Sequence, residues 1–573
     1  MNISIKQWSL VGAFFWATIS YSQVSIGVNS PSISAMLEVA STTKGLLLPR
    51  MSSVQHSQIT TPTSGLMVWC TNCGQNGLII YYNGYSWFDF NQNLIYNSPT
   101  RLSAQILNGS FILMWSAVTG ATDYTLKYRT QGTENWTVIN DGISDLNYYN
   151  FVTTTNNVNY EFAVAAISGI NTSPYVSALG VSVPTTSSSV MHQILSTGQS
   201  LSVGAFPLLS LSQPFQNKML NTNYSALVPL AGKVQGAAHN DAETISCGMA
   251  NTITNLTLGS NQFNSVVSLC GVSGAKYEVL KKGTEPYTNG LNRMIEARNL
   301  CYQEGKPYVV AAVTTIHGEA DTSTGVTAET YAGYLNQWQL DYETDAKIIS
   351  GQSEGVPLFT DQCASWTKFG KTKPTVSLGQ LKASIDNPSK IILVTPKYIF
   401  DYGTDGIHLN GNSQRRLGEY YGKVMKKVLV DHETWLPLSP SSVTRTNTIV
   451  TVTFNVPVAP LAFDTYAVAA KANYGFEYFD DSSTPPTITA VALAGPTSIS
   501  ITLSAIPTGG NKKIAYAYTG ILDVGAGRNI PDSTRGNLRD SDTTPAYYQD
   551  GNVPNTMGNS LRNWCVTFIE SVP

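Results

Sequence analysis

Val190-Met-His-Gln-Ile-Leu-Ser-Thr-Gly-Gln-Ser200 is the stretch of sequence that decides the fold of the central part of the chain. Its first half is a short apolar run typical of a strand, and Gly198 then permits a turn. Ser200 therefore follows the carboxyl end of a strand, which is where open parallel sheets place their sites. A Gly-x-Ser turn alone is weak evidence for chemistry, because such turns are common.

Apolar runs and helical spacing alternate downstream of this stretch. Tyr308–Val313 and Ile391–Thr395 have the composition of buried strands, whereas Asn289–Cys301 and Leu417–Val430 place apolar residues at helical spacing. Strands that alternate with helices predict a mostly parallel sheet with helices on both sides. We therefore predict a three-layer α/β domain over residues 190–435.

The segments on either side of this domain show the period-two pattern of β-strands. In residues 100–183, Phe111–Trp115 is followed by Tyr124, Leu126 and Tyr128 on one face, and later by Tyr160 and Phe162. This segment resembles a fibronectin type III β-sandwich, and we expect its aromatic residues to form the core. A Pro/Thr/Ser linker, 184–189, follows it. Residues 441–573 return to β alternation and are predicted to form an accessory β-sandwich.

The N-terminal residues indicate export and attachment. Lys6, the apolar run Leu10–Ile19 and the small residues around Ser22 match a secretory signal over residues 1–23, so we expect a secreted or cell-surface protein without a membrane span. Residues 24–97 consist of short β-like pieces and resemble the tail-fibre-like module of exported bacterial proteins. That resemblance implies attachment or a homo-oligomer formed through this module.

Composition excludes some partners and leaves the cysteines open. The 573 residues carry 34 Lys+Arg against 37 Asp+Glu, a net charge of -3, which argues against a surface for nucleic acid or anionic lipid. Among seven cysteines, Cys70 and Cys73 form a CxxC that we interpret as a local disulfide or two thiols, since no neighbouring His supports zinc. Bridges could also form among four cysteines of the central domain: Cys247, Cys270, Cys301 and Cys363.

A second motif in the central domain complements Ser200. In Asp405-Gly-Ile-His408 the two polar residues are three apart, so both can face the same side of one turn. The carboxylate can then accept a hydrogen bond from Nδ1–H, which leaves Nε2 to take a proton from a hydroxyl. The motif follows the last predicted strand of the domain, whereas Ser200 follows the first.

These two motifs resemble the first and last blocks of the SGNH (GDSL-like) hydrolase superfamily. Gly198-Gln-Ser200 and the middle motif His317-Gly-Glu-Ala-Asp321 are similar to its sialate O-acetylesterase and acetylxylan esterase branch, which usually has Gln-Gly-Glu in the middle. The resemblance spans about residues 190–432. It implies a Ser-His-Asp esterase in which Ser200 is the nucleophile, His408 the general base and Asp405 the residue that orients the imidazole.

The middle blocks fit this pattern less closely. Gly248 is a candidate backbone N–H donor to the oxyanion, and the loop Cys270–Gly274 is a rival. His317 stands where the branch has Gln, so it and Glu319 are candidates for oxyanion or substrate contact. The alternative is that Glu319 and Asp321 hold the loop by hydrogen bonds. A metal site at these residues lacks a recognised ligand spacing, and we predict no metal or cofactor.

The remaining histidines are assigned plainer roles. His192 lies on the first strand and is predicted to be structural, and His239 lies in a loop where it could touch substrate or simply face solvent. His56 and His432 are predicted to lie at the surface.

Three hypotheses for function follow. The first is an exported serine esterase that removes acetyl groups from a polysaccharide through an acyl-serine intermediate. The second is a non-catalytic adhesin or glycan-binding protein with a degenerate hydrolase domain, because most of the chain consists of β modules. The third is hydrolysis of an amide or lipid ester by the same residues.

Overall fold

The computed structural model describes most of the chain outside the N-terminus. The predicted signal segment up to residue 22, the 184–189 linker and His239 lie outside the described residues. Within the described part, no helix combines the length and the apolar character that a bilayer crossing requires. The described residues are 23–73, 77–90, 98–99, 102–107, 110–118, 120–139, 148–152, 158–168, 171–177, 181–182, 190–233, 242–259, 262–304, 306–520, 535–549 and 558–573.

The chain divides into two compact units. One contains residues 1–98, 118–123 and 165–175, and the other contains residues 99–117, 124–164 and 176–573. The second unit holds all six residues of the predicted site.

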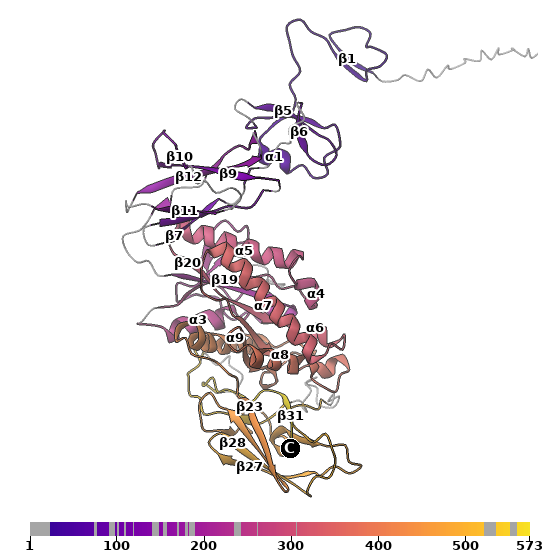
Figure 1. Ribbon diagram of the computed structural model, residues 1–573, viewed down its shortest axis with the longest axis vertical. Helices are drawn as coiled ribbons and strands as arrows, with labels where there is room; N and C mark the ends of the chain where they lie inside the picture. Colours follow the sequence, from indigo (N-terminus) through magenta and orange to yellow (C-terminus); the bar gives the residue numbers. More distant parts are fainter. Residues whose placement is uncertain are drawn as a thin grey trace, which may run out of the picture. The chain divides into compact units, whose positions relative to one another are not determined.

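A seven-stranded sheet forms the centre of the second unit (Figure 1). Every neighbouring pair is parallel except the edge pair β18–β17, so the prediction of a mostly parallel sheet with helices is confirmed. The strand order is β18 (Leu227–Pro229), β17 (Lys218–Leu220), β19 (Asn264–Leu269), β16 (Met191–Gly198), β20 (Tyr308–Ile316), β21 (Leu358–Gln362) and β22 (Ile391–Pro396).

Alternate residues of these strands enter two different hydrophobic cores, because successive side chains of a strand point to opposite faces. Ile194 belongs to the core that contains α3 (Ser246–Leu256) and α9 (Gly411–Met425), whereas Leu195 belongs to the core that contains α5 (Glu285–Gln303) and α7 (Ala328–Ser350). Figure 1 shows these helix pairs on the two faces of the sheet. The sheet is therefore covered on both sides, and the ends of its strands remain available for a site.

The domain contains further helical segments. They are α2 (Ser200–Val203), α4 (Tyr277–Leu280), α6 (Glu319–Thr322), η1 (Trp366–Phe369), α8 (Thr375–Asp386), η2 (Lys397–Ile399) and the π-helix η3 (Lys426–Val430).

Residues 103–182 form two antiparallel sheets, as a β-sandwich requires. The inward aromatic residues behave as predicted: Trp115 and Phe162 are buried, and Trp115 packs edge-on against Tyr124 at 5.3 Å between ring centroids. One sheet contains β7 (Ser103–Leu107), β8 (Ser110–Met114) and β11 (Tyr148–Val152); the other contains β9 (Asp123–Thr130), β10 (Thr137–Ile139), β12 (Asn159–Ser168), β13 (Asn171–Thr172), β14 (Val176–Ser177) and β15 (Val181–Ser182).

The C-terminal strands share a hydrophobic core with the α/β region. Trp435, Val452 and Tyr516 belong to the same cluster of buried residues as α3 and α9. Lys423 of α9, which is buried, pairs with Asp542 at 2.9 Å. The strands are β23 (Ser439–Thr446), β24 (Ile449–Asn455), β25 (Ala462–Phe463), β26 (Phe476–Phe479), β27 (Ile488–Gly495), β28 (Ser498–Leu503), β29 (Lys513–Tyr516), β30 (Leu538–Arg539) and β31 (Phe568–Ser571), with the 3₁₀ turn η4 (Ala472–Gly475) among them.

The N-terminal module is a small β structure with one helix. Strands β1 (Val24–Ile26) and β2 (Leu37–Val39) pair with each other, and a separate sheet contains β3 (Arg50–Met51), β4 (Met67–Cys70), β5 (Leu78–Tyr82) and β6 (Trp87–Asp89). The helix α1 (Ser53–Ser57) begins with a capping box, in which Ser52 and Gln55 satisfy each other's backbone N–H groups.

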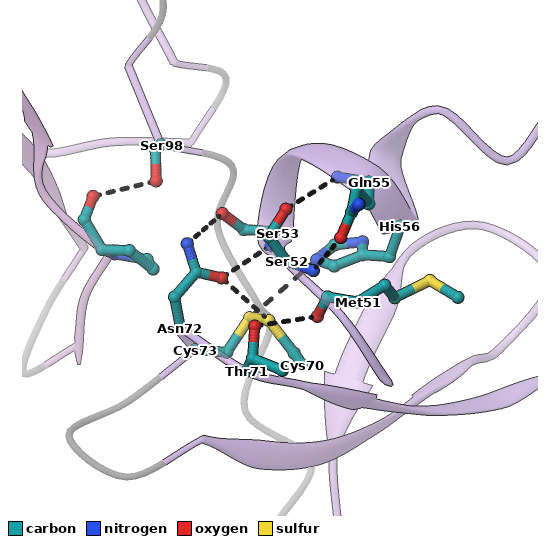
Figure 2. The surroundings of a disulfide bond; sticks show 11 residues. Met51, Ser52, Ser53, Gln55, His56, Cys70, Thr71, Asn72, Cys73 and Ser98 are labelled. Carbon is teal, nitrogen blue, oxygen red and sulfur yellow. Dashed lines mark hydrogen bonds between the residues drawn. A yellow bond between two sulfur atoms is a disulfide. The ribbon is translucent and has the colours of Figure 1, made fainter. Parts of the chain in front are cut away.

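Cys70 and Cys73 form a disulfide, one of the two alternatives left open by the sequence (Figure 2). His56 was predicted at the surface, but only 1% of it is exposed, because its ring packs against Trp87 beneath the disulfide. Nε2 of His56 lies 3.9 Å from Sγ of Cys73, so a histidine does neighbour the CxxC in space. These three residues could group around a metal ion, but the disulfide removes the thiolates that would bind one.

The bridges that the sequence left possible among the central cysteines are not formed. Cys247, Cys270, Cys301 and Cys363 are all unpaired and buried, as is Cys565. They lie within the packed cores of the second unit, where a thiol behaves as a small apolar side chain.

Candidate active site

The turn after β16 presents Ser200 at the carboxyl end of the sheet. Gly198 has a φ of +129°, and a Cβ at this position would lie 2.3 Å from the carbonyl oxygen of Ile316. Only glycine fits both the backbone conformation and this approach to β20. Ser200 is the first residue of the short helix α2, which is fixed by a hydrogen bond from Gln414 Nε2 to the carbonyl of Leu201 at 2.6 Å.

The loop between β22 and α9 brings His408 to Ser200. The hydroxyl Oγ of Ser200 lies 2.7 Å from Nε2 of His408, across 208 positions of sequence. Nδ1 of the same ring lies 2.5 Å from Oδ2 of Asp405. A proton on Nδ1, donated to the carboxylate, leaves the Nε2 lone pair to accept a hydrogen bond from the serine. The three predicted catalytic residues are therefore one continuous hydrogen-bond chain.

The second oxygen of Asp405 fixes the loop itself. Oδ1 accepts hydrogen bonds from the backbone N–H groups of Ile407 at 2.9 Å and His408 at 3.0 Å. Partial burial acts to raise the pKa of Asp405, but the hydrogen bonds from His408 and from the two backbone N–H groups outweigh it and lower the pKa. The carboxylate is therefore held in its charged form and in one orientation.

The chain of three residues is open to solvent. The side chain of His408 is 40% exposed and that of Asp405 is 48% exposed. Ser200 itself is partly exposed, so the hydrogen-bond chain lies at the surface of the domain.

Gly248 lies in the contact between two helices. A Cβ at Gly248 of α3 would lie 2.1 Å from the carbonyl oxygen of Arg415 in α9. The close approach of α3 to α9 therefore explains why residue 248 is a glycine. The predicted role as an oxyanion donor is not needed to account for it. In the rival loop, a Cβ at Gly271 would lie 2.0 Å from Oγ of Ser202 and 3.0 Å from the carbonyl oxygen of Gly198, so this loop adjoins the Ser200 turn.

His317 is buried and held by protein groups on both ring nitrogens, an arrangement that differs from the predicted contact with substrate. Nδ1 lies 2.9 Å from the hydroxyl of Tyr331, and Nε2 lies 3.1 Å from the carbonyl oxygen of Ala275. Burial lowers the pKa of His317, although Asp321 and Glu319 act in the opposite direction. The neutral ring can donate from Nε2 and accept at Nδ1, so it joins the loops that follow β19 and β20.

Glu319 is part of a buried cluster of charges. It lies 2.5 Å from Nζ of Lys397, which also lies 2.7 Å from Asp361, and all three side chains are excluded from solvent. Burial acts to raise the pKa of Glu319, but the ammonium of Lys397 outweighs it and lowers the pKa. Asp321 accepts a hydrogen bond from the backbone N–H of Tyr277 at 3.0 Å. These contacts support the alternative in which Glu319 and Asp321 hold the loop.

Sequence reasoning missed two links behind the Ser200 turn. Oε1 of Gln199 accepts a hydrogen bond from the backbone N–H of Ala320 at 3.0 Å, which ties the first motif to the middle one. Lys397 and Asp361 complete the charge cluster. The signal for Lys397 was its position directly after the strand Ile391–Pro396, at the same edge of the sheet as Ser200.

Of the two other described histidines, one is structural and one is exposed. His192 stacks on Phe263 at 3.8 Å between ring centroids, and its Nδ1 bonds the carbonyl of Asn264 at 3.2 Å. Burial lowers the pKa of His192 to about 4, so its ring is neutral near pH 7. His432 is exposed, as predicted.

Comparison with known families confirms the predicted resemblances. Residues 215–427 match the family described as "Carbohydrate esterase, sialic acid-specific acetylesterase", and residues 25–105 match the "Phage tail like trimerisation region". The esterase match includes Asp405 and His408 and begins after Ser200. No curated protein matches the chain.

Several solved structures are similar to parts of the chain. A carbohydrate acetylesterase from Xanthomonas citri is 11% identical, with a TM-score of 0.47 over 83% of this chain and 100% of that one. A carbohydrate acetylesterase from Sinorhizobium meliloti is 14% identical, with a TM-score of 0.25 over 41% and 98%. A Fn3-like protein from Clostridium thermocellum is 24% identical, with a TM-score of 0.13 over 14% and 88%.

The family match defines the class of protein. The match of residues 215–427 assigns the chain to the carboxylic ester hydrolases, and the matching family is described as carbohydrate esterases. Its central segment is similar to sialic acid-specific acetylesterases, and its N-terminal segment is similar to a trimerisation region.

Proposed function

We propose that the protein is an exported serine esterase that removes O-acetyl groups from a polysaccharide. The observation that carries this proposal is the chain of hydrogen bonds from Ser200 through His408 to Asp405, with distances of 2.7 and 2.5 Å. The central domain is then a three-layer SGNH-like domain, and the signal segment directs the protein to the cell surface or the medium.

In the first half of the reaction, Oγ of Ser200 attacks the carbonyl carbon of the acetyl group while Nε2 of His408 takes the hydroxyl proton. The negative charge that develops on the carbonyl oxygen requires N–H donors. The backbone of the loop at Gly271, beside Ser202, is better placed for this than Gly248. Collapse of the intermediate breaks the bond to the sugar oxygen, which receives the proton from His408, and leaves acetyl-Ser200.

In the second half, His408 takes a proton from water as the water oxygen attacks the acetyl-serine carbonyl. Collapse releases acetate and returns the proton to Oγ of Ser200. The carboxylate of Asp405 stabilises the imidazolium in both halves, and its lowered pKa keeps it charged in this role.

The test is release of acetate from acetylated xylan, pectin, alginate and O-acetyl sialic acid, together with hydrolysis of p-nitrophenyl acetate. Ser200→Ala should reduce turnover of every accepted substrate by at least about 10³-fold, because it removes the atom that forms the acyl intermediate. A Ser200→Ala protein that remains active would overturn the assignment. Binding of these glycans without turnover would support the non-catalytic alternative, and a preference for long acyl chains would support a lipid ester.

A further inference from the structure

A polar groove lies in the second unit between the turn that follows β17 and the part of α5 from Asn289 to Glu296. Its volume is about 490 Å³, and every side chain that lines it is polar. No residue of the Ser200–His408–Asp405 chain contributes to it.

The turn that forms one wall is rigidly built. Oδ1 of Asn221 accepts hydrogen bonds from the backbone N–H groups of Ser225 at 2.8 Å and Ala226 at 3.2 Å. Tyr224 has a φ of +58°, a left-handed conformation that is costly for a bulky residue and persists only where the surroundings impose it. The turn thereby holds Asn223, Tyr224 and Ser225 at the groove.

The opposite wall is one face of α5. Asn289, Asn292, Arg293 and Glu296 are spaced three and four residues apart, so they form a single stripe along the helix. The guanidinium of Arg293 lies 5.7 Å from the ring centroid of Tyr224, and its Nη2 donates to the tyrosine hydroxyl at 3.2 Å. This contact joins the two walls and fixes the ring of Tyr224.

The groove opens at the same end of the sheet as Ser200. Strand β17 runs parallel to β19, and β19 runs parallel to β16, so the Asn221–Ala226 turn and the Ser200 turn both follow carboxyl ends of strands. A Cβ at Gly290 of α5 would lie 3.0 Å from Sγ of Cys270, at the end of β19, which places this part of α5 at the same level. Because β17 is two strands away from β16, these two strands lie about 10 Å apart across the sheet, and so do the starts of the turns that follow them.

We propose that this groove binds the glycan chain of the substrate beyond the sugar whose acetyl group reacts at Ser200, an inference that rests on the proposed function. Asparagine amides both donate to and accept from hydroxyl groups, and Tyr224, which lines the groove, adds aromatic ring surface for the C–H side of a sugar. The opposite charges of Arg293 and Glu296 balance each other, so the groove fits an uncharged glycan rather than an acidic one. At this separation it engages a polymer but not a small acetate ester.

The experiment compares two substrates on the full chain: acetylated xylan and p-nitrophenyl acetate. Tyr224→Ala should lower the ratio of kcat/KM on xylan to kcat/KM on p-nitrophenyl acetate about tenfold, through a higher KM for the polymer. Asn292→Ala, a change on α5 and not in the turn, should lower the same ratio in the same direction. Tyr466→Ala, which changes a tyrosine 76% exposed in the turn after β25, is the matched control and should leave the ratio unchanged.

The outcomes separate this proposal from the proposed function. An active protein in which Tyr224→Ala and Asn292→Ala leave the ratio unchanged contradicts the groove, as does a preference for acetylated alginate over acetylated xylan. If the wild-type chain hydrolyses none of the acetate esters named above, the proposed function fails, and calorimetric titration with deacetylated xylan then tests whether the groove binds a glycan. If the wild type binds deacetylated xylan and Tyr224→Ala binds it more weakly, the groove proposal is supported. Equal affinity of the two proteins, or no binding by the wild type, contradicts the proposal.

Discussion

His408 is the proton acceptor and donor of the proposed reaction, because its two ring nitrogens face different partners. Nε2 faces the hydroxyl of Ser200, and Nδ1 faces the carboxylate of Asp405. The carboxylate selects the tautomer in which Nδ1 carries the proton. Removal of its charge should therefore affect the reaction without removing the nucleophile.

Asp405→Asn tests this arrangement. The amide can donate to Nδ1 and so stabilise the wrong tautomer, and we expect kcat on p-nitrophenyl acetate to fall about 10³–10⁴-fold. Steady-state kinetics measures the effect, with Asp386→Asn, a change in an exposed pair with Lys382, as the control. A loss below about tenfold would mean that Asp405 does not govern the tautomer.

At the scale of single residues, the sequence predicted which three residues come together, Ser200, His408 and Asp405, but not the surroundings of every histidine. Ser200 and the Asp-x-x-His motif could be predicted because their spacing and their positions after strands carry the information. The burial of His317 and His56 could not, because their partners Tyr331, Ala275 and Trp87 are supplied by distant segments.

At the scale of elements, the loops behind Ser200 are held by the buried charges of Lys397, Glu319 and Asp361. These residues come from η2, α6 and β21, so the ammonium of Lys397 links η2 to the other two elements at the carboxyl edge of the sheet. A buried charge that loses its partner costs far more than an exposed one.

Lys397→Met should therefore lower the free energy of unfolding by about 3–5 kcal/mol at pH 7, because it leaves two carboxylates buried without a cation. Urea denaturation followed by tryptophan fluorescence measures the change. Lys382→Met, in the exposed pair with Asp386, is the matched control and should have little effect.

The same cluster predicts a dependence on pH. The pKa of Glu319 is lowered in the folded protein, so its contribution to stability is present above the unfolded value of about 4.3 and is lost as the pH falls through the lower folded value. In Lys397→Met burial raises the pKa of both carboxyl groups, because the cation that opposes it is gone, so these groups are protonated first as the pH falls. The difference between wild type and Lys397→Met should accordingly shrink as the pH falls from 7 to below about 4.3. A difference that is the same at pH 7 and pH 4 and below would show that the cluster is not ionised as described.

Elements with continuous apolar runs could be predicted, whereas polar buried elements could not. The predicted strands Tyr308–Val313 and Ile391–Thr395 lie within β20 and β22. Strand β21 was missed because Thr360, Asp361 and Gln362 are fully buried but polar, which resembles a loop in sequence. Glycine is equally ambiguous: Gly248 serves helix packing and Gly271 adjoins the Ser200 turn, and only the fold distinguishes them.

At the scale of the whole molecule, the C-terminal strands are packed into the central domain. Tyr398 donates to the carbonyl of Cys565 at 2.6 Å, and Gln362 bonds the backbone of Thr567 in both directions. The sequence predicted a separate accessory domain, because a linker-like stretch precedes residue 441 and the hydrophobic pattern then changes to that of strands. These two signals do not reveal whether the C-terminal strands share a hydrophobic core with the α/β domain, as they do here. The boundaries 190–435 and 441–573 thus remain a prediction from sequence.

The N-terminal module should assemble the chain into a trimer. It matches a trimerisation region, and many large apolar side chains in it are exposed, among them Ile33 at 98%, Leu47 at 75% and Met36 at 68%. Exposed apolar surface of this kind indicates a protein interface. Light scattering after size exclusion should give three times the chain mass for the mature protein and one chain mass for residues 98–573. A monomeric mature protein would contradict the proposal.

The central claim is that Ser200 forms a covalent intermediate with the help of His408. The most direct measurement is peptide mass spectrometry of the full chain after reaction with a fluorophosphonate, which traps activated serines. The account predicts one adduct, on the peptide that contains Ser200, absent in Ser200→Ala and strongly slowed in His408→Ala. An adduct on another serine, or labelling of Ser200 at the same rate without the imidazole, would contradict it.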